Sequence, residues 1–119
     1  MAAERRARET LLRDLRSLHP PYRVTVNGLT AAEPAAIVEA LKTVAPVKVY
    51  VHRKSLDPIE LVIRDEARTI RLAVAQDSRL WQQFWVSVPN DSLFRPYGQD
   101  AGRVTDWRLA GLLSSSGKN

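Results

Sequence analysis

His52 and Glu60 are the residues whose types and spacing best suit acid–base chemistry. The alternating pattern predicts strands over 47–53 and 59–64, joined by a connection short enough for a hairpin. Facing each other across that hairpin, the imidazole could act as a base and the carboxylate could orient it. A cross-strand polar pair on a solvated face is the other interpretation of the same two residues. A small enzyme using this His/Glu pair therefore ranks third among the functions we consider.

A second kind of chemistry, nucleic-acid binding, is indicated by aromatic and basic residues on one face of the predicted sheet. Trp81 and Trp85 lie four positions apart on the predicted strand 80–88, so both point to the same face, about 13 Å apart along the strand. The tryptophans could stack on bases while neighbouring cations meet phosphates. In the alternative, a terminal helix covers the tryptophans, because large apolar side chains are usually buried. The candidate binding residues on this face are Trp81, Trp85, Tyr50, Lys48, Arg64, Arg71 and His52.

Other sources of chemistry are scarce in this sequence. It contains no cysteine and only two histidines, so a thiol nucleophile and a thiolate zinc site are excluded. No His-Glu-x-x-His, Walker or Gly-x-Ser-x-Gly motif occurs. His19 precedes two prolines at a predicted helix end, where it would interact with the helix dipole. We therefore expect neither a bound metal nor a cofactor, and no catalytic residue is assigned.

The N-terminal segment predicts an amphipathic helix over residues 3–18. Leu11, Leu15 and Leu18 recur on one face of this helix, which predicts that it docks on its own sheet or on a second copy of the chain. Its five arginines are interleaved with acids, with Glu4–Arg8 and Glu9–Arg13 at the favourable i,i+4 spacing. This pattern is more typical of a solvated, self-paired helix face than of a surface that grips nucleic acid.

The remaining elements follow from periodicity and turn residues. Residues 22–27 form a predicted strand that ends at the turn signal Asn27-Gly28, and Thr30 with Glu33 has the form of a capping box for a helix over 30–45. Period-two alternation predicts a meander of four strands, 47–53, 59–64, 68–75 and 80–88. Glycines and a proline predict a loop over 95–103, followed by a helix over 105–113 that is our favoured lid for the tryptophans, and a flexible tail over 114–119.

Together these elements predict an α+β fold. We expect an antiparallel four-stranded meander plus one further strand, with the 30–45 helix packed on the apolar sheet face and flanking helices at both ends. The chain has 119 residues and 13.4 kDa, with 45% hydrophobic and 26% charged residues, which fits a single small domain over 1–119.

The formal net charge of +5 and the sequence pI near 10.1 mark the chain as basic. No apolar run long enough to span a membrane and no secretory signal pattern occurs, so we expect a cytoplasmic protein. The function we rank first is a non-enzymatic binding domain, a protein-interaction or accessory module that could self-associate through the leucine stripe of the first helix or through the tryptophan face. The alternative is nucleic-acid binding through the aromatic and basic sheet face.

Overall fold

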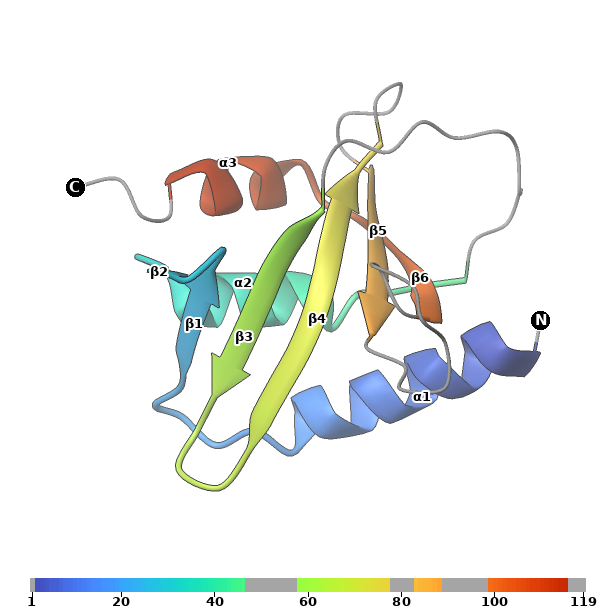
Figure 1. Ribbon diagram of the computed structural model, residues 1–119, viewed down its shortest axis with the longest axis horizontal. Coiled ribbons are helices and arrows are strands. Elements are labelled where there is room, and N and C mark those ends of the chain that lie inside the picture. The colour runs from blue at the N-terminus through green and yellow to red at the C-terminus, as the bar shows by residue number, and fades with distance from the viewer. Residues whose placement is uncertain (1, 47–57, 78–82, 89–98, 116–119) are drawn as a thin grey trace.

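The computed structural model describes residues 2–46, 58–77, 83–88 and 99–115. The elements in chain order are α1 (Ala2–Arg16), β1 (Arg23–Val26), β2 (Leu29–Thr30), α2 (Pro34–Leu41), β3 (Ile59–Arg64), β4 (Thr69–Gln76), β5 (Gln83–Val88), β6 (Gln99–Thr105) and α3 (Trp107–Ser115). The six strands form one antiparallel sheet in the order β2-β1-β3-β4-β5-β6 (Figure 1). Within the part of the chain that the structure describes, no helix is long and apolar enough to cross a membrane.

The α+β class agrees with the sequence analysis, but the predicted strand set is wrong. Six strands form the sheet instead of a four-stranded meander plus one. The predicted strand 47–53 lies outside the described residues, and the neighbour of β3 opposite β4 is β1. This pairing joins Arg23–Val26 to Leu61–Arg64 across a long stretch of chain, which local periodicity does not report.

The predicted loop over 95–103 is also wrong, because Gln99–Thr105 is the edge strand β6. Gly102 lies within this strand at φ 148°, and a Cβ there would fall against the carbonyl oxygen of Ala45. Ala45 and Arg103 exchange backbone hydrogen bonds of 2.8 and 2.9 Å at this close approach. The register also shifts between Val86 and Ser87, where β6 carries one extra residue. A glycine that looks like a strand breaker in the sequence therefore permits a strand to pass close to another segment.

Both ends of α2 differ from the predicted helix over 30–45. Thr30 belongs to β2, and the N-cap is Glu33, which makes no side-chain capping hydrogen bond, so the predicted capping box is wrong. The helix begins at Pro34, where a missing N–H costs nothing, and ends at Leu41 rather than at residue 45. The turn signal is confirmed, because Asn27 and Gly28, both at positive φ, connect β1 to β2 through the pair Val26–Leu29.

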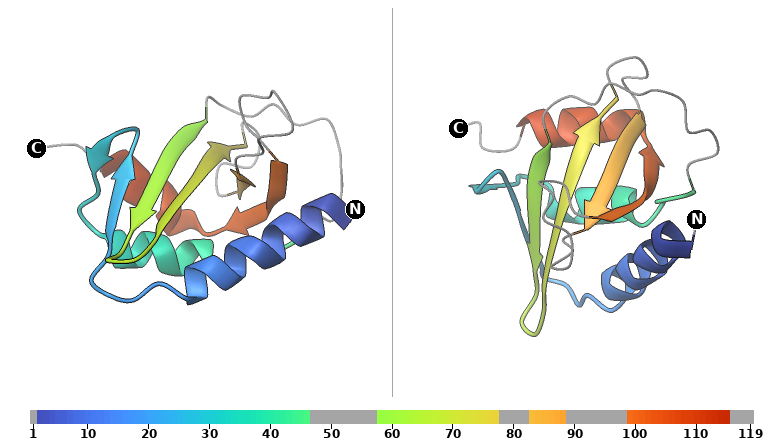
Figure 2. Two further views of the ribbon diagram at one scale, coloured as in Figure 1. Left: turned by 60° about the horizontal axis from the view of Figure 1, so that its bottom comes forward. Right: turned by 45° about the vertical axis from the view of Figure 1, so that its right-hand side comes forward.

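The three helices gather on one face of the sheet (Figure 2). Ile37, Val38 and Leu41 of α2 are fully buried in one cluster with the apolar side chains of the strands. Leu109 and Leu113 of α3 join the same cluster, and α3 packs beside α2. The predicted lid over the tryptophans is therefore wrong, since α3 covers the opposite face.

Helix α1 docks on its own chain. Leu11, Leu15 and Leu18 are 2%, 0% and 8% exposed and belong to the same core cluster, so the leucine stripe is occupied within one molecule. The guanidinium of Arg8 donates to Glu4 Oε2 at 3.1 Å and to the carbonyl oxygen of Ala101 in β6 at 3.2 Å. The predicted Glu4–Arg8 pair thus exists, but it is buried against β6 instead of solvated.

Candidate functional site

The strand register sorts the side chains of the sheet into two faces. The pairs Val24–Ile63, Ile63–Ile70 and Leu61–Leu72 place the apolar residues under the helices. The alternate positions form the opposite face, which we call the open face because, among the described elements, no helix covers it, although its Val62, Trp85 and Ser87 are buried. It carries Arg23, Thr25, Glu60, Val62, Arg64, Thr69, Arg71, Ala73, Ala75, Trp85 and Ser87. The two-face assignment made from alternation is therefore confirmed for these strands.

Three arginines lie together on the open face. Arg23 of β1 is directly opposite Arg64 of β3, and Arg71 of β4 is directly opposite Val62, the next residue of β3 on this face. Adjacent strands are about 4.8 Å apart, so the three side chains start from neighbouring positions on three adjacent strands. We call Arg23, Arg64 and Arg71 the arginine surface.

The arginine surface carries uncompensated charge. All three residues are exposed, and none has an ion pair with a carboxylate of the described residues. Like charges placed directly opposite each other in a sheet destabilise it. Glu60 shares the face, diagonal to Arg71 in register, yet makes no ion pair with it. Among the described residues, these three cations therefore have no carboxylate partner and are available to an external anion.

The structure does not describe four residues of the predicted site, namely Lys48, Tyr50, His52 and Trp81. Of the predicted His52–Glu60 pair, it therefore describes Glu60 alone. The backbone of Glu60 is held by Asn27, whose N–H donates to the Glu60 carbonyl at 2.8 Å and whose Oδ1 accepts from the Glu60 N–H at 2.8 Å. The structure brings Arg64 and Arg71 together as predicted and adds Arg23.

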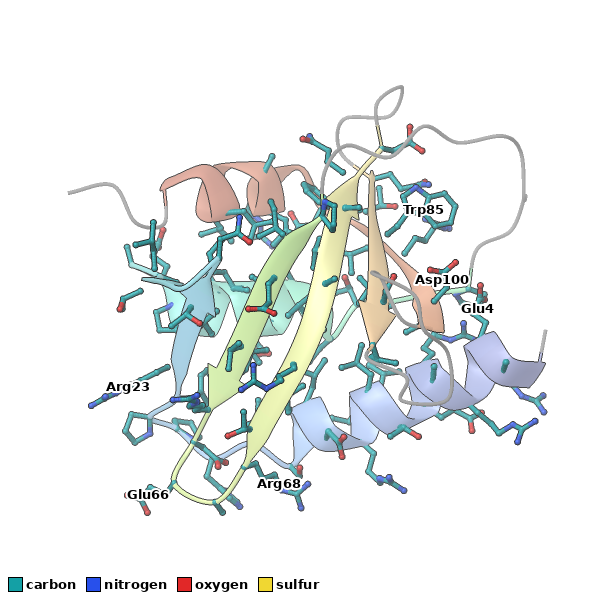
Figure 3. All side chains as sticks on the ribbon, viewed as in Figure 1. Glu4, Arg23, Glu66, Arg68, Trp85 and Asp100 are labelled. Carbon is teal, nitrogen blue, oxygen red and sulfur yellow. The ribbon has the colours of Figure 1, made fainter. Side chains whose placement is uncertain are left out.

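Trp85 lies on the same face but is buried, with 5% of its surface exposed. Its Nε1 donates to Asp77 Oδ2 at 3.2 Å, and Asp77 is itself buried. Figure 3 shows Trp85 near the opposite end of the sheet from Arg23. The indole in this arrangement is a packed, hydrogen-bonded core residue and presents no free ring for base stacking.

Arg23 is the residue that sequence reasoning missed. The sequence predicts the strand 22–27 but not its neighbour in the sheet, so Arg23 is not joined to Arg64 and Arg71 at that stage. Alternation alone separates Arg23 from the core, because Val24 and Val26 are buried and Arg23 then points to the other side.

One end of the sheet is stabilised by a carboxylate in the β3–β4 hairpin. Asp65 accepts hydrogen bonds from the backbone N–H groups of His19, Ala67 and Arg68, at 3.0, 2.8 and 2.6 Å. These bonds, with that from His19 contributing most, lower the pKa of Asp65 below its ordinary value. The chain between α1 and β1 is thereby attached to the hairpin that follows Arg64.

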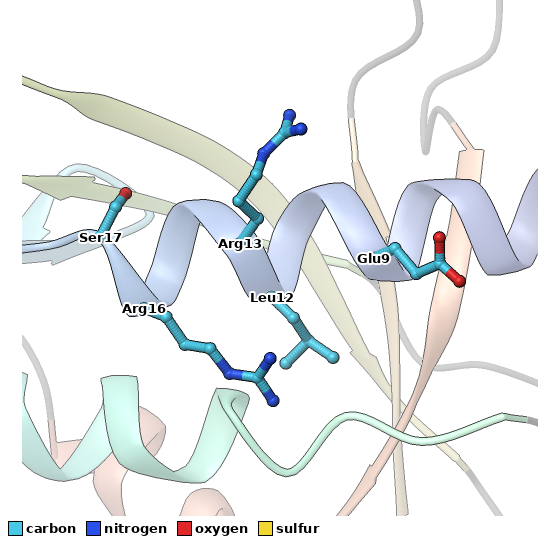
Figure 4. A pocket seen from close by; sticks show the side chains of 5 residues that line it. All are labelled: Glu9, Leu12, Arg13, Arg16 and Ser17. Atoms are coloured by element: carbon cyan, nitrogen blue, oxygen red, sulfur yellow. The ribbon is translucent and has the colours of Figure 1, made fainter.

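In the described part of the chain, hollows occur along α1. One, of about 460 Å³, is lined among the described residues by one helix only, with Leu12 and Arg16 on one side and Arg13 and Ser17 on the other (Figure 4). The second, of about 550 Å³, lies between α1 and the strands and includes Arg71 in its lining. No group of three or more potential metal ligands occurs in the described ranges.

Comparison of the chain with protein-family models, with curated proteins and with solved structures found no match.

Proposed function

We propose that this chain is a non-enzymatic domain that binds nucleic acid, and that the arginine surface contacts the phosphates of the bound strand. The observation that carries the proposal is the cross-strand pair Arg23–Arg64 with Arg71 beside it, exposed and without acidic partners among the described residues. Guanidinium groups bind phosphate oxygens in a bidentate manner, and regularly spaced cations suit a chain of regularly spaced anions.

The sequence analysis ranked a protein-interaction module first, and two observations now favour the alternative. The leucine stripe, one of the two surfaces through which self-association was expected, is occupied within the molecule. In addition, Leu29 is the one exposed large hydrophobic residue among those described, so the described surface offers no apolar patch of the kind that protein interfaces use at their centre.

The burial of Trp85 determines the kind of nucleic-acid binding that we propose. Without a free aromatic platform on the described face, binding would depend on phosphate contacts, which carry no sequence information. We therefore expect binding that is insensitive to sequence and strongly weakened by salt. Three phosphate contacts to a single strand correspond to a log–log salt slope of about −2, which is roughly a fifteenfold loss of affinity between 50 and 200 mM salt.

The test is a salt titration of binding to a fluorescein-labelled oligothymidylate, measured by fluorescence anisotropy. Arg71→Gln should weaken binding at low salt and reduce the magnitude of the slope by about 0.7, the contribution of one phosphate contact. Arg5→Gln is the matched control, because it removes the same charge from a residue that pairs with Glu9 on α1, away from the open face. The control should leave both affinity and slope unchanged.

Two results would contradict the proposal. At 20 mM salt, phosphate contacts strengthen to the order of micromolar affinity. If neither single-stranded nor duplex probes bind under this condition, the proposal is overturned. Binding of polyglutamate that depends on Arg71 while no oligonucleotide binds would instead identify a module for acidic protein partners.

A further inference from the structure

The arginine surface continues into the larger of the two hollows beside α1. This cavity, of about 550 Å³, is lined by α1, the beginning of β4 and the end of β5. Arg71 lines it and also belongs to the arginine surface, so the cavity and that surface adjoin at this residue. Figure 1 shows α1 running past the lower end of β4 at this point.

Two cations from different elements line the cavity. Arg6 comes from α1 and Arg71 from β4, and both are exposed. Neither has an ion pair with any carboxylate that the structure describes. The hydroxyl-bearing residues Thr10 and Thr69 line the same cavity, which adds hydrogen-bond donors beside the two guanidinium groups.

The acidic residue in the lining, Asp14, does not cancel this charge. Its Oδ1 lies 3.6 Å from Arg68 Nη1 and 3.9 Å from Arg13 Nε, so its carboxylate is already paired with two other arginines. Arg6 and Arg71 therefore remain available to an anion that enters the cavity.

The rest of the lining is apolar and the space is larger than a phosphate needs. Ala7 and Leu11 of α1 face Ile70 and Val88 of the sheet across the cavity. A volume of about 550 Å³ falls within the range of pockets that hold small organic ligands, about 300–1,000 Å³. The lining thus suits a phosphate attached to a ring better than it suits a bare inorganic ion.

From these observations we infer that the cavity receives the terminal phosphate monoester of a bound nucleic-acid strand, together with the nucleoside that carries it. The inference rests on the proposed function and adds recognition of the strand end to it. A terminal phosphate monoester carries between 1.5 and 2 negative charges at neutral pH, whereas an internal diester carries one. Two arginines contributed by different elements, Arg6 of α1 and Arg71 of β4, supply the cationic charge that suits the terminal group better than the internal one.

The experiment compares three unlabelled oligothymidylates of the same length that compete with the labelled strand. One ends in hydroxyls, one carries a 5′-phosphate and one carries a 3′-phosphate. We expect one of the two phosphorylated strands to bind about tenfold more tightly than the hydroxyl-ended strand, as an added charge-assisted, bidentate contact would produce.

The variants separate end recognition from binding along the strand. Arg6→Gln should remove the preference for the phosphorylated end and leave the affinity for the hydroxyl-ended strand within about twofold of wild type, since Arg6 lies off the sheet face. Arg23→Gln should weaken all three strands by the same factor and preserve the preference. Arg5→Gln, one position away on α1 and paired with Glu9, should change neither quantity.

Each failure has a separate signature. Equal affinity of the three strands for the wild-type chain overturns end recognition and leaves the proposed function in place. A preference that survives Arg6→Gln also overturns the cavity as its source. Absence of binding to all three strands overturns the proposed function and this inference with it.

Discussion

At the scale of single residues, two side chains show how an ordinary residue acquires a specific role from its partners. The indole of Trp85 could have served as an exposed stacking platform on its strand. Instead it is 5% exposed and donates a hydrogen bond to Asp77, so its role is structural. Asp65 is a hairpin carboxylate whose three backbone hydrogen bonds lower its pKa. Each of these assignments predicts a measurable effect.

Removal of the Trp85 ring should destabilise the fold. Trp85→Ala should lower the free energy of unfolding by about 3–5 kcal/mol, since a large buried side chain leaves a cavity. Trp85→Phe should cost less, because it retains much of the volume and loses only the Nε1 donor to Asp77. Urea unfolding followed by circular dichroism measures both. A cost below about 1 kcal/mol for Trp85→Ala would mean that the ring is exposed in solution.

The pH dependence of stability should change when Asp65 is replaced. The pKa of Asp65 is lowered in the folded chain, so its contribution to stability is present above its ordinary value of 3.8 and is lost as the pH falls through the folded-state pKa. Asp65→Asn replaces an acceptor oxygen by an NH₂ group and should lower the melting temperature at pH 7. The difference from wild type should shrink below pH 3.8.

Glu66→Gln is the control for that comparison, because Glu66 occupies the next position of the same hairpin and is exposed. Its melting temperature should follow that of the wild type throughout. A difference between wild type and Asp65→Asn that stays constant from pH 7 to pH 2.5 would show that the carboxylate charge does not matter.

At the scale of elements, the contact between β6 and the segment after α2 depends on one glycine. The Ala45–Arg103 bridge brings two backbones so close that position 102 has no room for a methyl group. The positive φ of Gly102 adds to this restriction, since side chains rarely adopt it.

Substitution of this glycine should disturb the edge of the sheet. Gly102→Ala should lower the free energy of unfolding by about 2 kcal/mol or more, from steric overlap and backbone strain together. Gly111→Ala is the matched control, because Gly111 lies in α3 with nothing within 4 Å of the added carbon. There the same change should raise stability by about 0.5–1 kcal/mol, since alanine favours helix. Equal effects of the two substitutions on thermal unfolding would contradict the close approach at β6.

At the scale of the whole molecule, α1 completes the core instead of joining two copies. Its leucines are buried against residues of the same chain, and its Glu4–Arg8 pair is buried where Arg8 donates to Ala101 of β6. Exposed cationic side chains lie on the open face, along α1, in the β3–β4 hairpin and on α3.

This arrangement predicts a monomer with a protected first helix. Sedimentation equilibrium should give the mass of one chain, and the amides of Leu11 and Leu15 should exchange slowly with solvent. Leu15→Ala should lower the free energy of unfolding by about 2–5 kcal/mol and should leave the mass unchanged. Leu12→Ala, at a half-buried position one turn away, should cost less. A concentration-dependent dimer that dissociates on Leu15→Ala would show that the stripe joins two copies.

Features that depend on short-range periodicity could be predicted from the residues alone. Alternation assigned the residues of β3, β4 and β5 to their faces, because successive side chains on a strand point to opposite sides whatever the neighbouring strand is. The turn at Asn27-Gly28 and the apolar faces of α1 and α2 were equally local. Arg64 and Arg71 could therefore be placed on one face before any contact was known.

Only the tertiary structure decided which distant segments meet. Local patterns do not encode that β1 lies beside β3, which completes the arginine surface with Arg23. Nor do they encode that α3 packs beside α2 on the face opposite Trp85. They also do not encode that Gly102 lies in a strand and not in a loop. The physical reason is common to these cases. Pairing and close approach are settled by competition among many long-range contacts, whereas propensity and alternation report only on neighbours along the chain.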